Sequence, residues 1–222
     1  MVEPMYRRIA QDLREEIQSG TPVEKVEPFV TTLSADPETG LGGGEGEAAY
    51  SEVIERGRTP TWSVPKVEVQ VATGNVAARL RVPEGTQVVS RHQERFIDKT
   101  PWSLQTTYYP MDLISSGAEA LRSAGDVPGG TVAYLKEKLG IVQIGYRDRI
   151  LVRSPNENES RFFRLPDDGR ISVVSISRTA YQDSDEGPVP YRVTFTIFPA
   201  DRNQLVINSG EVPAALAAPA EV

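Results

Sequence analysis

Residues 88–110 concentrate polar side chains that could bind a small anion. β-Branched and aromatic residues flank the turn-forming segment Asp98–Pro101, a pattern typical of a β-hairpin. Because side chains alternate along a strand, Arg91, Gln93 and Arg95 should share one face. Arginine binds carboxylate or phosphate through two parallel hydrogen bonds. The hairpin therefore predicts a polar sheet face suited to a small anionic or polyhydroxy ligand.

Similar polar side chains recur at alternate positions of the later predicted strands. Besides the three residues above, the candidate ligand-binding set comprises Gln105, Arg147, Arg149, Arg192, Thr194 and Thr196. Two interpretations of this set are open. Facing strands could gather the side chains into one pocket, or they could form a solvated sheet face with scattered ion pairs, which are common and weak.

Composition narrows the possible chemistry. The chain has 222 residues and no cysteine, so disulfides, thiolate nucleophiles and thiolate metal sites are excluded. Its single histidine, His92, excludes a multi-histidine metal site and lies off the arginine face, without a local signature of a catalytic triad. We expect no metal, no cofactor and no catalytic residue. The net charge of −7 argues against broad nucleic-acid binding, and we expect a cytoplasmic protein without a membrane segment.

Periodicity and turn signals predict an α+β fold with an antiparallel sheet and packed helices, because most neighbouring strands are joined by tight turns. Strands are predicted over residues 62–72, 88–97, 102–110, 145–153, 171–180 and 190–198. Helices are predicted over residues 5–20, 48–56, 77–81, 112–124, 131–139 and 156–165.

The hairpin also carries a family resemblance. The turn Asp98–Pro101 and the later Tyr108–Pro110 segment resemble the start of the UTRA effector-binding domain of GntR-type transcription regulators of the HutC subfamily. The resemblance implies a chorismate-lyase-like fold with a ligand pocket between sheet and helices, and a homodimer formed through the sheet. We assign residues 48–215 to this domain and residues 216–222 to a tail.

The N-terminal segment resembles part of the same family's DNA-reading module. Residues 6–20 are similar to the first helix of the GntR winged helix-turn-helix, so residues 1–22 are interpreted as its remnant. The second helix, recognition helix and wing do not follow; they are deleted, or a segment is missing from the sequence. Residues 23–47, which include a glycine-rich run, are interpreted as a linker. A winged-helix domain would be the DNA-binding part of the intact protein.

The family's amino-sugar-sensing members imply particular site positions. Their two phosphate-binding arginines fall here on Gln93 and Arg95, and a sugar-binding glutamate falls on Gln105. Arg149 stands where many members have glutamate. This pocket is thus more cationic and less acidic than the amino-sugar type, which favours a carboxylate-bearing or otherwise anionic effector.

Two main functions compete at this point. The favoured one is a ligand sensor that controls DNA binding by a dimer, and not an enzyme. The alternative is a chorismate-lyase-like enzyme that grips a small carboxylate with Arg91, Arg95 and Arg149 and uses an acid such as Glu94. The regulator-like N-terminal helix and linker favour the sensor, whereas turnover of a bound acid would favour the enzyme. A degenerate sensor that pairs with intact relatives is a third possibility.

Overall fold

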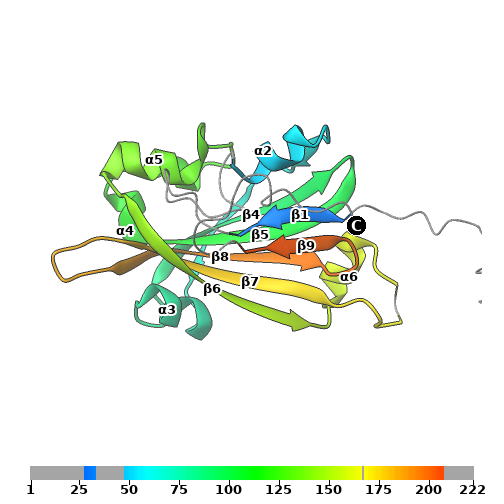
Figure 1. The fold of residues 1–222 in the computed structure, drawn as a ribbon. Helices are drawn as coiled ribbons and strands as arrows, with labels where there is room; N and C mark the ends of the chain where they lie inside the picture. Colours follow the sequence, from blue (N-terminus) through cyan, green and yellow to red (C-terminus); the bar gives the residue numbers. More distant parts are fainter. Residues whose placement is uncertain (1–27, 34–47, 167, 208–222) are drawn as a thin grey trace, which may run out of the picture.

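A computed structural model describes residues 28–33, 48–166 and 168–207 (Figure 1). The expected helix over residues 5–20 and the tail over 216–222 lie outside the described residues. The strands are β1 (Phe29–Thr32), β2 (Pro60–Trp62), β3 (Lys66–Val71), β4 (Gln87–Ile97), β5 (Thr100–Pro110), β6 (Gln143–Arg153), β7 (Val173–Gln182), β8 (Val189–Pro199) and β9 (Asn203–Val206). The helices are α2 (Ala48–Glu55), α3 (Gly74–Leu80), α4 (Met111–Ser115), the 3-10 helix η1 (Glu119–Arg122), α5 (Gly130–Leu139) and α6 (Glu157–Phe163).

The central element is an antiparallel sheet in the order β2-β4-β5-β8-β7-β6, with β3 also paired to β4. The predicted hairpin forms two neighbouring inner strands of this sheet. β4 and β5 are joined at Asp98 and Lys99, whose φ angles of 49° and 67° make the tight turn. The predicted α+β fold with an antiparallel sheet is confirmed. The register of the sheet places Gln93 on β4 opposite Gln105 on β5, and Gln105 opposite Thr196 on β8.

Helices cover both faces of the sheet. α2 and α5 lie on one side and α3 on the other (Figure 1). On the α5 side, Val89 and Tyr109 pack with Leu121 and Leu135. On the other side, α3 packs on Val88 and Val193 through an apolar cluster, and α6 packs next to Val173. Burial of these apolar faces on both sides stabilises the sheet and fixes which side chains face each layer.

Part of the segment predicted as a linker, residues 23–47, is a strand, β1. Phe29–Thr32 forms a strand parallel to β9, and Phe29 and Leu33 are buried against Trp102 and Phe198. The Leu33 carbonyl also accepts a 2.6 Å hydrogen bond from the Tyr146 hydroxyl. The short apolar run is a strand because β9, far away in the sequence, supplies its hydrogen-bonding edge.

Two predicted elements are interrupted. The strand expected over residues 62–72 is divided into β2 and β3, since Pro65 has no N–H to donate to the ladder. The helix expected over residues 112–124 is divided into α4 and η1 at Gly117, whose φ of 118° is incompatible with a continuous helix. The first interruption directly follows Trp62, which lines the cavity of the candidate site.

Candidate functional site

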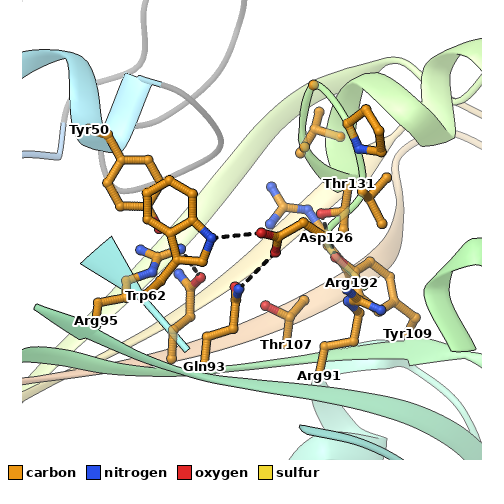
Figure 2. A pocket seen from close by; sticks show the side chains of 16 residues that line it. Tyr50, Trp62, Arg91, Gln93, Arg95, Thr107, Tyr109, Asp126, Thr131 and Arg192 are labelled. Carbon is orange, nitrogen blue, oxygen red and sulfur yellow. Dashed lines mark hydrogen bonds between the residues drawn. The ribbon is translucent and has the colours of Figure 1, made fainter. Parts of the chain in front are cut away.

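A cavity of about 310 Å³ lies on the face of the sheet that α2 and α5 cover. Its floor comes from alternate residues of β4, β5 and β8, and its walls come from α2, β2 and the loop that leads into α5 (Figure 2). It is lined by Tyr50, Trp62, Arg91, Gln93, Arg95, Gln105, Thr107, Tyr109, Asp126, Val127, Pro128, Gly129, Gly130, Thr131, Val132 and Arg192.

Arg95 supplies positive charge at one end of the cavity. Its guanidinium donates a hydrogen bond to the Gln105 side-chain oxygen and lies 5.4 Å from the centre of the Tyr50 ring. Gln105 in turn donates a 3.3 Å hydrogen bond to the Thr196 hydroxyl. This row of side chains across three strands orients Arg95, a prerequisite for binding an acid group in a fixed pose.

Arg192 supplies a second buried positive charge, from the middle of β8. It donates hydrogen bonds to the Tyr191 hydroxyl at 3.1 Å, the Gln143 side-chain oxygen at 2.7 Å and the Thr194 hydroxyl at 3.3 Å. These three acceptors orient the guanidinium at the cavity floor. Thr194 also lies 3.1 Å from the Thr107 hydroxyl.

Asp126 places a carboxylate on the cavity wall. One oxygen accepts a 2.8 Å hydrogen bond from the Trp62 indole N–H, and the other accepts a 3.3 Å bond from the Gln93 amide (Figure 2). The Trp62 ring stacks on Tyr50 with centroids 4.5 Å apart. Three separate segments therefore meet at this wall: α2, β2 and the loop before α5.

Arg91 reaches the same loop but binds backbone. Its guanidinium donates to the carbonyl oxygens of Leu121 at 2.9 Å, Ser123 at 2.6 Å and Gly125 at 2.8 Å. With 7% of its surface exposed, Arg91 is buried, and this burial lowers its pKa from the usual arginine value. Arg91 thus anchors the loop backbone up to Gly125, the residue before Asp126.

Burial also shifts the pKa of Tyr50. Removal from water raises the pKa of its hydroxyl, the Arg95 charge opposes this rise, and the Asp126 charge adds to it. The Tyr50 hydroxyl consequently stays protonated at neutral pH and can donate a hydrogen bond.

The predicted residues divide into three groups. Arg91, Gln93, Arg95, Gln105 and Arg192 line the cavity, and Thr194 and Thr196 bond to lining side chains. Arg147 and Arg149 are not among the lining residues. They are exposed on the opposite face of β6, because Tyr146 and Asp148 take the positions that face the covered side.

Sequence reasoning missed Tyr50, Trp62 and Asp126. Tyr50 and Trp62 lie in segments for which only a helix and a strand were predicted, without a role in a site. Asp126 is followed by Val-Pro-Gly-Gly, a pattern that predicts a loop but not which part of the sheet the loop contacts. An acidic residue in a glycine-rich loop was the available signal. In the described residues no cluster of three potential ligands could hold a metal ion.

An antiparallel sheet with a charged, helix-covered cavity on one face is the α+β, chorismate-lyase-like fold seen in effector domains of GntR-family regulators. The family model of the UTRA domain matches residues 55–204, and the chain belongs to this family. The predicted UTRA resemblance is thereby confirmed. No curated protein matches the sequence.

Solved structures share the fold. The C-terminal domain of Yurk from Bacillus subtilis is 22% identical, with a TM-score of 0.54, over 65% of this chain and 93% of that one. The effector domain of PhnF from Mycobacterium smegmatis is 18% identical, with a TM-score of 0.60, over 80% and 99%. PhnF from the same organism is 17% identical, with a TM-score of 0.63, over 94% and 91%. At these identities the likeness concerns the fold alone.

Proposed function

We propose that this protein is the ligand-sensing part of a GntR-type, HutC-like transcription regulator. A small anionic metabolite binds in the cavity and changes how a homodimer engages DNA through a winged-helix domain in the intact protein. The observation that carries the proposal is the cavity itself, with the two oriented arginines Arg95 and Arg192 on its floor. Membership of the UTRA family supports it.

The site of action of such a regulator is the cytoplasm, where both DNA and metabolites are available. In the described part of the chain no helix is long and apolar enough to cross a membrane. For the alternative of a lyase, Glu94 is the example of the acid required. It alternates with Arg95 along β4 and is not among the residues that line the cavity, where Asp126 is the acid instead.

The experiment is a thermal-shift screen of the whole chain at fixed salt against sugar phosphates, amino acids, dicarboxylates and aromatic acids. We expect a saturable rise in melting temperature with one chemical class, because a ligand that binds the folded state stabilises it. Arg95→Gln should abolish the shift, whereas Arg149→Gln, on the opposite face, should retain it.

Melting curves without ligand show whether both variants fold. Failure of every class to shift a cooperatively folded protein would contradict the proposal. Equal losses in Arg95→Gln and Arg149→Gln would also contradict it, since the effect would then reflect net charge and not the cavity.

A further inference from the structure

Asp126 is a negative charge built into a cavity whose floor is positive. Its two oxygens accept hydrogen bonds from Trp62 and Gln93, both neutral donors. Within residues 28–33, 48–166 and 168–207, no lysine or arginine forms an ion pair with Asp126. The carboxylate therefore has spare acceptor positions at the cavity wall.

The surroundings hold this carboxylate in place. Arg91 binds the carbonyls of Ser123 and Gly125, directly before Asp126, and thereby fixes the course of the loop. Trp62 and Gln93 then fix the two oxygens from β2 and β4 (Figure 2). The position of the Asp126 carboxylate at the cavity wall is therefore fixed from both the loop and the sheet.

An aromatic surface borders the same carboxylate. Tyr50 and Trp62 stack nearly parallel, with 20° between their planes, and the Trp62 N–H points at Asp126. The indole N–H lies in the ring plane, so Asp126 lies at the edge of Trp62, and its negative charge attracts a cation to this part of the cavity. The exposed fraction of Trp62 is 41%, so its ring is accessible from the cavity mouth.

We propose that the effector carries two opposite charges: an acid group that Arg95 and Arg192 bind, and a protonated amine that Asp126 binds. The inference rests on the proposed function and narrows it from anionic metabolites to zwitterionic ones, such as amino acids. Asp126 is the residue that distinguishes an amine-bearing ligand from its amine-free analogue, because its negative charge attracts an ammonium group and repels an acid that lacks one.

The test uses matched probe pairs that differ by the amine: phenylalanine and 3-phenylpropionate, glutamate and glutarate, glucosamine 6-phosphate and glucose 6-phosphate. Binding of each to the whole chain is measured by thermal shift and then calorimetry. We expect the amine-bearing member of one pair to bind at least tenfold more tightly. Asp126→Asn should remove this preference, since the neutral amide keeps an acceptor oxygen for Trp62 but loses the charge.

Asp185→Asn is the matched control, because Asp185 is exposed in the turn between β7 and β8, and it should leave the preference unchanged. Amine-free members that bind the native chain as tightly as their partners would overturn the inference and leave the proposed function standing. Absence of binding by every pair would overturn the inference, and the proposed function would then be decided by the wider thermal-shift screen.

Discussion

Arg91 shows how one cavity-lining side chain can also hold a loop of the binding site in place. It reaches from the sheet floor to the backbone of residues 120–125 and holds the loop that carries Asp126. A lysine at this position would keep the charge but could not span the same carbonyl oxygens, because an ammonium group lacks the planar fork of a guanidinium. The loop carbonyls would then lose their buried donors.

We therefore expect Arg91→Lys to lower the free energy of unfolding by about 2–4 kcal/mol, as loss of a buried hydrogen-bond network does. Urea unfolding measures the loss, and hydrogen exchange should show faster exchange at residues 120–126. Arg147→Lys, at an exposed position of β6, is the control and should change stability by less than about 0.5 kcal/mol. Unchanged exchange in the loop of Arg91→Lys would contradict the anchoring role.

At this scale the sequence indicated which residues share a face but not which face meets the cavity. Alternation correctly grouped Arg91, Gln93 and Arg95, which the structure places on the cavity floor. The same rule grouped Arg147 with Arg149, and the register of β6 turns both away from the cavity. Asp126 escaped detection because its contacts with Trp62 and Gln93 join segments far apart in the sequence.

The α6 helix shows how an element can begin through local chemistry. Asn156 accepts a hydrogen bond from the Glu159 N–H, and the Glu159 carboxylate accepts one from the Asn156 N–H, which completes a capping box. Arg153, the last residue of β6, binds both Glu159 oxygens at 2.7 Å. Glu159 thus connects the end of the strand to the start of the helix.

This connection makes stability depend on pH. Burial raises the pKa of the Glu159 carboxyl, but hydrogen bonds from Arg153 and the Asn156 N–H outweigh burial and bring the pKa below its usual value. A lowered folded-state pKa stabilises the protein above the unfolded-state value of about 4.3, and this stabilisation disappears as the pH falls through the folded-state value.

We expect Glu159→Gln to lower the free energy of unfolding by about 2 kcal/mol at pH 7, since the charge-assisted pair with Arg153 is lost while the amide oxygen still completes the capping box. The difference from the native chain should shrink below pH of about 4, where the native carboxyl is protonated too. Urea unfolding across pH checks this. Glu157→Gln, exposed in the same first turn, is the matched control. A difference that does not change with pH would contradict the charge-based explanation.

Long periodic segments were predictable at the scale of elements, whereas short ones were not. The alternation in residues 88–110 predicted the β4–β5 hairpin, and the Asp98 turn fixed where it reverses. The four-residue strand β1 carries too little pattern to distinguish it from a linker, since its stability comes from pairing with β9 and packing on Trp102. Such tertiary contacts decide the structure of short apolar runs.

The large sheet has two different edges. At one, β2 and β3 both pair with β4, and β2 continues into the cavity wall. At the other, β6 is the last strand of the sheet, and in the described residues no strand pairs with its outer edge. An eleven-residue strand at a sheet border, with Ile150, Leu151 and Val152 exposed by 45–61%, is a template for pairing with another chain.

The proposed homodimer would use this β6 border, because a two-fold axis beside it would join two sheets and bury the apolar side chains of both copies. We expect Val152→Lys to weaken the dimer at least tenfold in Kd, since a charged side chain on an edge strand opposes edge-to-edge pairing. Val64→Lys is the matched control: Val64 is 75% exposed, but it lies between β2 and β3, away from this edge. Sedimentation velocity over a concentration series measures both variants. If both substitutions weakened the dimer equally, or if Val64→Lys alone weakened it, the interface would lie elsewhere. The prediction that the dimer forms through the outer edge of β6 would then be wrong.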